Sequence, residues 1–135
     1  MNIIILEGED QRLYTMVARL VMDEEVLAYN LNYPFKTSPD YLWFIAADKD
    51  TVLGFMPVKK DQDKSKAKIN NYYVADDDGD VLSALLEEVI QELSKDYEIE
   101  SVTQLRHVPD FERNGFTVML YWTRYAKMRL SRDEK

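Results

Sequence analysis

The chain has 135 residues, of which 46% are hydrophobic and 31% are charged, so it has enough apolar material for one sizeable core. This composition excludes a largely disordered chain, and the absence of cysteine excludes disulfide scaffolds, cysteine-bound zinc and thiol nucleophiles. The single histidine excludes a multi-histidine metal site. The 25 acidic and 17 basic residues give a net charge of −8, which argues against binding to the phosphates of nucleic acids.

The sequence shows neither an export signal nor a membrane span. Its apolar start is shorter than the core of a signal peptide, and no segment approaches the roughly 20 apolar residues of a membrane helix. We therefore expect a cytoplasmic protein without a membrane partner. We expect a single domain over residues 1–130, followed by a short charged tail at 131–135.

The first third of the chain predicts one strand and two helices. The β-branched run at 3–6 predicts a short buried strand, and apolar residues at helical spacing over 13–21 predict an amphipathic helix. A second, shorter helix is expected over 23–31. Pro34 and Pro39 then bracket a loop, because a proline disfavours helix in the residue before it.

The middle of the chain predicts a meander of strands. Segments 41–47 and 51–58 predict a hairpin, in which Gly54 indicates a bulge or a close backbone approach. The lysine-rich segment 59–68 predicts a solvated hairpin tip. The aromatic-rich segment 67–75 predicts a central strand, although its apolar residues alternate poorly.

The last third begins with the clearest helix of the chain, over 81–93, whose leucines and valines form two adjacent apolar columns. A strand is expected over 98–106, one or two helical turns over 109–114, and one long or two short strands over 116–130. Together these elements predict an α/β (mixed α+β) domain. Its mixed, mainly antiparallel sheet should have six or seven strands, with helices on both faces.

The order of these elements and four of their motifs resemble the GCN5-related N-acetyltransferase (GNAT) family. Segment 43–55 resembles its second and third strands, 69–74 its fourth strand, and 109–116 its late helix with the following Asn-Gly-Phe. Segment 125–130 is similar to the usual ending. The resemblance covers nearly the whole chain and implies an acyl-CoA N-acyltransferase fold. It also implies transfer of an acetyl or other acyl group from acyl-CoA to an amine acceptor, which the sequence does not identify.

The resemblance also implies where acetyl-CoA, or another acyl-CoA, is held. The pantetheine arm should pair with the backbone of Tyr73 and Val74, as a borrowed strand edge. The phosphates should lie at the turn and first helical residues that follow. We expect that turn to comprise Gly79, Asp80, Val81 and Leu82.

Proton transfer at such a site needs side chains that titrate or donate near the reacting atoms. His107 and Tyr72 are the candidates. His107 could be a base, could cap the late helix or could lie in solvent, and Tyr72 could instead be a core residue. Arg106 could meet a phosphate or pair with the acidic long helix, and Asn71 could orient an amine or pair across strands.

Two features depart from the family pattern. The phosphate turn carries Asp76, Asp77, Asp78 and Asp80, which would repel a diphosphate. Asp78 or Asp80 could instead cap the helix, and the remaining carboxylates of the turn are expected to be solvated. Phe111 stands where the family usually has a tyrosine that protonates the leaving thiolate.

These departures keep a second function open: a non-catalytic binding or assembly module that has the fold and has lost acetyl-CoA. No metal is expected, because the spacing of the aspartates does not match a calcium loop. The C-terminal aromatic residues suggest a possible homodimer, built through Tyr121, Trp122 and Tyr125.

Overall fold

The computed structural model describes residues 1–131 and contains a single sheet of eight strands. The strands are β1 (Asn2–Glu7), β2 (Tyr41–Asp48), β3 (Thr51–Asp61), β4 (Lys66–Ile69), β5 (Tyr73–Val74), β6 (Glu98–Gln104), β7 (Phe116–Tyr121) and β8 (Tyr125–Leu130). The α-helices are α1 (Gln11–Val21), α2 (Glu24–Tyr29), α3 (Gly79–Leu93) and α4 (Val108–Arg113). Short 3₁₀ turns, η1 (Ala75–Asp77) and η2 (Leu105–His107), precede α3 and α4.

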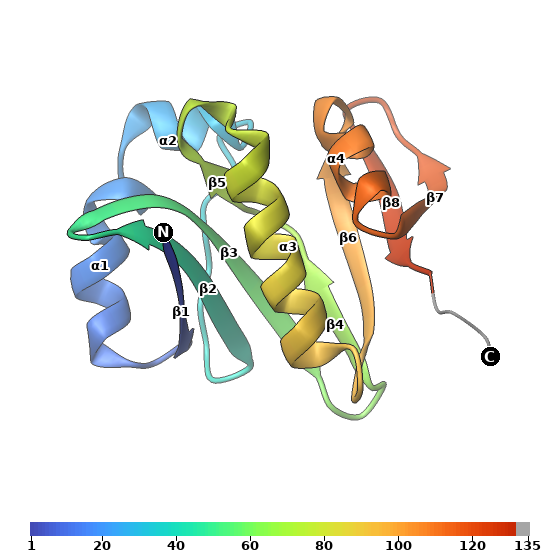
Figure 1. The fold of residues 1–135 in the computed structure, drawn as a ribbon, viewed down its shortest axis with the longest axis horizontal. Coiled ribbons are helices and arrows are strands. Elements are labelled where there is room, and N and C mark those ends of the chain that lie inside the picture. The colour runs from blue at the N-terminus through green and yellow to red at the C-terminus, as the bar shows by residue number, and fades with distance from the viewer. Residues whose placement is uncertain (132–135) are drawn as a thin grey trace.

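The strands follow the order β1-β2-β3-β4-β6-β8-β7, and β5 pairs with β3 outside this path. All the pairings are antiparallel except that of β4 with β6, which is parallel. Figure 1 shows α3 crossing the middle of the sheet, with α4 beside it in front of β6 and β8. The predicted fold class is therefore confirmed.

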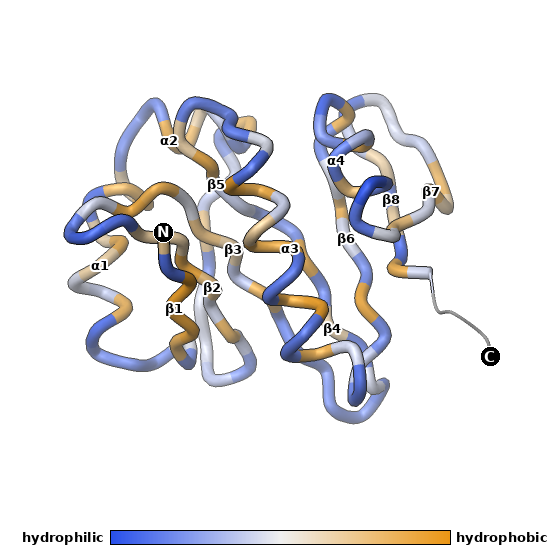
Figure 2. Tube along the Cα trace, in the orientation of Figure 1, coloured by the Kyte–Doolittle hydropathy of each residue, from blue (hydrophilic) through white to orange (hydrophobic). Residues whose placement is uncertain are grey.

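Successive side chains of a strand point to opposite faces of the sheet, and apolar side chains on both faces form two hydrophobic cores. Phe44 and Met56 point to the face covered by α3 and α4, whereas Trp43, Ile45 and Phe55 point to the face covered by α1 and α2. The inward side of α3 supplies much of the larger core, as its two apolar columns predict. Figure 2 shows this helix alternating between hydrophobic and hydrophilic residues along its length.

Gly54 lies at a close approach of two strands. Ala46 pairs with Gly54 and Ala47 with Val52, so Leu53 is an extra residue in β3 and forms a bulge. A Cβ at Gly54 would lie 2.6 Å from the carbonyl oxygen of Tyr73. Only a glycine lets β5 approach β3 this closely, so the prediction made from Gly54 is confirmed.

The single strand predicted over 67–75 is wrong, since the structure divides it into β4 and β5. Three residues, 70–72, lie opposite the two residues Met56 and Pro57 of β3. Pro57 has no N–H to donate to a strand ladder, and the extra residue is accommodated there. The insertion lets both Ile69 and Tyr72 face the α3 core, which explains the poor alternation of the sequence.

Three other predicted boundaries also change. The solvated tip is shorter than 59–68, because β3 continues to Asp61 and β4 begins at Lys66; Figure 2 shows this tip as hydrophilic. The strand predicted over 98–106 ends at Gln104, where η2 begins. The segment 116–130 forms two strands, which is one of the two expected outcomes. The sheet has eight strands rather than six or seven because the segment 67–75 is divided into β4 and β5.

Three further predictions concern membrane spans, the C-terminal tail and the homodimer. Within residues 1–131, no helix is both long and apolar enough to cross a membrane. The tail expected at 131–135 lies, beyond Ser131, outside the described residues. Tyr121 and Trp122 are exposed at the end of the edge strand β7, whereas the hydroxyl of Tyr125 is buried, and the homodimer stays a prediction.

Candidate active site

The site begins where two neighbouring strands separate. β4 and β6 pair in parallel only over Lys66–Ile69 and Glu98–Ser101. Beyond this point the chain after β4 turns away to form β5, which pairs with β3, while β6 continues alongside β8. In the described part of the chain, the other edge of β5 therefore has no strand partner and faces a gap between the separated strands.

The turn into α3 lies at the far end of this gap and is built by aspartates. Asp76 and Asp77 have positive φ angles of 56° and 52°, a left-handed conformation that aspartate tolerates better than most residues. Asp78 is the N-cap of α3, and its side chain accepts a hydrogen bond of 2.9 Å from the N–H of Asp80. The predicted capping by Asp78 is confirmed.

The four residues predicted to hold phosphates differ in what their backbones can offer. The N–H of Asp80 is taken by the Asp78 side chain, and that of Leu82 by the Asp78 carbonyl. Among the described residues, the N–H groups of Gly79 and Val81 have no hydrogen-bond acceptor. Two donors at the start of α3 therefore remain available to a ligand.

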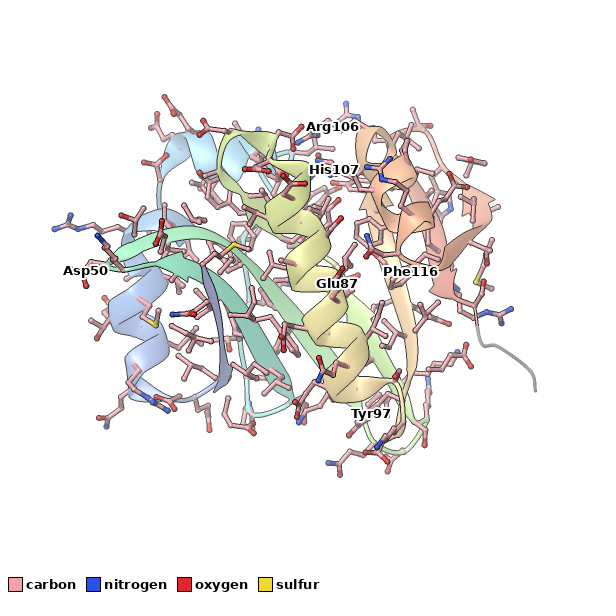
Figure 3. All side chains as sticks on the ribbon, in the orientation of Figure 1. Asp50, Glu87, Tyr97, Arg106, His107 and Phe116 are labelled. Atoms are coloured by element: carbon pink, nitrogen blue, oxygen red, sulfur yellow. The ribbon has the colours of Figure 1, made fainter. Side chains whose placement is uncertain are left out.

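Asp77 of this turn forms hydrogen bonds with three side chains from other elements, and one of these, His107, also contacts a fourth side chain. His107 Nε2 lies 2.6 Å from Asp77 Oδ1, and His107 Nδ1 lies 2.7 Å from Tyr72 Oη. Tyr29, at the end of α2, donates to the same Asp77 oxygen at 2.8 Å, and Arg106 donates to the other oxygen at 3.0 Å. We call these five residues the histidine cluster; Figure 3 shows Arg106 and His107 together beside the start of α3.

The cluster defines the protonation state of its members. Burial lowers the pKa of His107 below its ordinary value of 6.5, although Asp77 opposes this, so the imidazole is neutral at pH 7. Burial alone would raise the pKa of Asp77. Hydrogen bonds from His107, Tyr29 and Arg106 outweigh this effect and lower the pKa of Asp77 to about 2. Since a carboxylate only accepts, His107 carries its proton on Nε2, and Nδ1 accepts from the Tyr72 hydroxyl.

The buried hydroxyl of Tyr72 lies in the gap itself. It accepts a hydrogen bond of 3.3 Å from the N–H of Gln104, the last residue of β6. Burial raises the pKa of Tyr72 above its ordinary value of 10, so the hydroxyl stays protonated. Tyr72, His107 and Asp77 thus form a continuous hydrogen-bonded chain from the gap to a carboxylate.

Several predictions for single residues are corrected by this geometry. His107 neither lies in solvent nor caps α4 with its side chain, because it is buried among the cluster. Asp77 is not simply solvated, and Arg106 pairs with Asp77 just before the long helix. Asn71 donates to the carbonyl of Pro34 at 3.4 Å rather than pairing across strands.

Sequence reasoning missed the parts of the cluster that come from distant segments. Tyr29 lies 78 residues before His107, and its position at the end of a short helix gives no sign of a polar role. Asp77 carried a weak signal, since a lone histidine in an acidic chain is expected to find a carboxylate. Its left-handed backbone, which aims the side chain at His107, is not visible in the sequence.

Phe111 occupies the position expected for a catalytic tyrosine and is a core residue. Its ring is fully buried, 5.2 Å from the Phe116 ring and 5.8 Å from the Tyr72 ring, measured between centroids. It therefore packs α4 against the cluster and has no proton to give.

A cavity of about 450 Å³ opens on the other side of the gap. Asn70 and Asn71, from the segment that leaves β4, line one wall, and Val102 of β6 lines another. These residues lie directly after the last paired residues of the two strands. We call this cavity the acceptor pocket, because its lining includes residues from both of the separated segments; the Tyr72 side chain is not part of that lining.

Within residues 1–131, no three histidine, cysteine, aspartate or glutamate side chains gather into a group that could hold a metal ion.

The titration of His107 can be followed directly, because it is the only histidine in the chain. We expect its NMR titration midpoint below 6.5, and a lower midpoint still in Asp77→Asn, which removes the carboxylate that favours the charged imidazole. Because the unfolded chain takes up this proton before the folded chain does, stability should fall as the pH drops below about 6.5. A midpoint above 6.5, or a rise in Asp77→Asn, would contradict the assigned geometry.

Comparison with solved structures identifies the fold. The chain has the acyl-CoA N-acyltransferase fold of the GCN5-related N-acetyltransferases, since similar structures superpose over nearly its full length at 11–16% sequence identity. ElaA of Escherichia coli aligns with a TM-score of 0.76 and 12% identity, covering 96% of this chain and 99% of that chain. An acyl-CoA N-acyltransferase from Pseudomonas aeruginosa aligns with a TM-score of 0.76 and 14% identity, covering 97% and 100%.

The ribosomal-protein-S18-alanine N-acetyltransferase from Escherichia coli aligns with a TM-score of 0.64 and 16% identity, covering 99% of this chain and 97% of that chain. No sequence model of a protein family and no curated protein sequence matches the chain. The predicted resemblance is therefore confirmed for the fold.

Proposed function

We propose that this protein is an N-acyltransferase that moves an acetyl or other acyl group from an acyl-CoA thioester to an amine. The observation that carries the proposal is the separation of β4 and β6, which leaves an edge of β5 free beside a hydrogen-bonded chain of titratable side chains. The fold is compatible with this chemistry, and the geometry of the site supports it.

The pantetheine arm fits the free strand edge. Tyr73 and Val74 pair with β3 on one side only, so their backbone groups on the other side can bind the amides of an extended ligand. Val74 is buried and Tyr73 is partly exposed, so the ligand would meet a strand edge that is fixed in place by the core.

The diphosphate fits the start of α3 less well. Gly79 and Val81 offer two free N–H groups and the positive end of the helix dipole. Exposed Asp76 and Asp80 oppose them, and the carboxylate of Asp110 in α4 comes within 3.2 Å of a Cβ placed at Gly79. Most of the affinity is therefore expected to come from the pantetheine end.

Acetyl-CoA, when bound, supplies the acyl group as a thioester that an amine can attack. In the proposed reaction Tyr72 Oη takes a proton from the amine and passes its own proton to His107 Nδ1. Asp77 stabilises the imidazolium that forms, since its carboxylate lies 2.6 Å from Nε2. The same path in reverse returns the proton from His107 to Tyr72, which gives it to the departing sulfur.

The test compares two acyl donors by calorimetry: acetyl-CoA, and S-acetylpantetheine, which lacks the diphosphate and nucleotide. We expect both to bind, and ligand at about 100 times its dissociation constant should stabilise the fold by about 2.7 kcal/mol. The double variant Asp76→Asn with Asp80→Asn should bind acetyl-CoA roughly tenfold more tightly at low salt, because acetyl-CoA carries phosphates that the aspartates repel. Its affinity for S-acetylpantetheine, which has no phosphate, should not change. Asp77 is kept in this variant, since it holds His107.

The outcomes separate the proposed enzyme from the non-catalytic module. Release of free thiol from acetyl-CoA in the presence of an amine is the measurement of transfer. If neither donor binds at millimolar concentration, the proposal is wrong and the chain is a binding or assembly module with this fold.

A further inference from the structure

The acceptor pocket has a charge opposite to that of the protein as a whole. Its lining includes Lys36, from the segment between α2 and β2, and Lys59 of β3, and it contains no aspartate or glutamate among the described residues. Neither lysine forms an ion pair within 4.0 Å in the described part of the chain. Two uncompensated cations thus line a pocket in a protein of net charge −8.

This charge limits which amines the pocket can take. An amine approaches as an ammonium ion, and two lysines repel it. A polyamine or an aminoglycoside-like acceptor would multiply that repulsion. An acceptor that also carries an anionic group would reverse it, since the anion could lie against the lysines.

Two buried hydrogen-bond donors lack partners among the described residues: one belongs to Tyr125, which lines the pocket, and the other to Gln104, its neighbour across the strands. Tyr125 and Gln104 face each other across β8 and β6, and the Tyr125 hydroxyl and Gln104 Nε2 are both buried and unbonded among the described residues. The Gln104 side-chain oxygen accepts from Arg106, so its unused atom is the amide nitrogen, a donor. The unused hydroxyl of Tyr125, a residue of the pocket lining, favours a ligand with an acceptor atom, such as a carboxylate oxygen.

We infer that the acceptor is a small amine that carries a carboxylate, of the amino-acid type, bound with its anionic group toward Lys36 and Lys59 and its amine toward the gap. This inference rests on the proposed function. A cavity of about 450 Å³ suits a small molecule better than a folded partner.

The test measures acceptor binding without an acyl donor, so it does not depend on catalysis. Calorimetry with L-glutamate, L-alanine and 1,4-diaminobutane should rank them in that order, with glutamate at least tenfold tighter than the diamine. O-Phospho-L-serine distinguishes a phosphate from a carboxylate as the preferred anion. The inference is overturned if the diamine binds as tightly as glutamate, or if none of the four binds at roughly 10 mM.

Paired substitutions locate the binding. The double variant Lys36→Gln with Lys59→Gln should bind glutamate about tenfold more weakly and should bind the diamine at least as tightly as the unchanged protein does. Lys49→Gln with Lys64→Gln is the control, because it makes the same change in net charge at exposed turns away from the pocket. Equal effects of the two double variants would refute the assignment of the pocket.

A third variant tests the unused donor. Tyr125→Phe removes only a hydroxyl that has no partner among the described residues, so the melting temperature should hardly change while glutamate binds several-fold more weakly. Unchanged glutamate affinity would overturn the role of this donor.

The two proposals fail in distinguishable ways. If glutamate binds as expected and no thiol is released from acetyl-CoA, the pocket binds amino acids, but the proposed transfer is wrong and with it the role of glutamate as an acceptor. If thiol is released with diamines alone, the transfer stands and the acceptor class is wrong.

Discussion

Tyr72→Phe should lower kcat for acyl transfer by about 10²–10⁴-fold while acetyl-CoA still binds. The substitution keeps the ring and removes the hydroxyl that lies 2.7 Å from His107 Nδ1 and links it to the gap. Without it, no side chain of the cluster connects the reacting amine to the imidazole. Steady-state kinetics together with calorimetric titration of acetyl-CoA would separate this loss from a loss of binding.

Stability must be measured beside activity for this variant. Removing the hydroxyl also leaves His107 Nδ1 and the N–H of Gln104 without that partner, and an unsatisfied buried group costs about 1–3 kcal/mol. The assay is therefore run well below the melting temperature of the variant. Tyr14→Phe, on the exposed side of α1, is the matched control. A folded Tyr72→Phe protein with unchanged kcat would rule out the proposed proton path.

Phe111→Ala should lower the free energy of unfolding by about 3–5 kcal/mol. The ring is fully buried and lies between the rings of Tyr72 and Phe116, so its removal leaves a cavity between α4 and the histidine cluster. Chemical denaturation of the variant would give the difference directly. Phe111→Leu, which refills most of the space, should cost clearly less.

The same position offers a test of the missing tyrosine. Phe111→Tyr buries a new hydroxyl in an apolar contact, so it should destabilise the protein and should not raise kcat. A gain in activity would show that this position can supply the proton after all, and would shift the role away from Tyr72. A loss of less than about 1 kcal/mol in Phe111→Ala would contradict the core role.

The elements that local pattern determines were predictable from the sequence. The helix over 81–93 has one dominant apolar period, and the hairpin formed by 41–47 and 51–58 has one turn signal between its arms. The division of the segment 67–75 into β4 and β5 was not predictable from the sequence, because it depends on a residue inserted opposite Pro57 of β3. A shift of pairing partners of this kind is a tertiary property that no local window contains.

The residues of the candidate site also fall into two groups, those that the sequence indicates and those that only the structure shows. Tyr72, His107 and the turn at Gly79 follow from where strands end and helices begin, so the sequence pointed to them. Tyr29 and Asp77 became visible only in three dimensions, since they depend on how α2 packs and on two left-handed residues. The acidic turn carries more than a repulsive charge, because one of its carboxylates holds the only histidine.

The parallel pairing of β4 with β6 has a mechanical consequence. It is four residues long and is the only strand pairing among residues 1–131 that joins the sheet around β3 to the sheet around β8. The far end of the gap lies roughly 10–13 Å beyond this seam, so a rotation of about 10° around it would change the gap width by about 2 Å. Beyond the seam the two halves are held by side chains, since Tyr72 is bonded to Gln104 and His107, and Asp77 to His107 and Arg106. These hydrogen bonds, and not a strand ladder, oppose such a rotation.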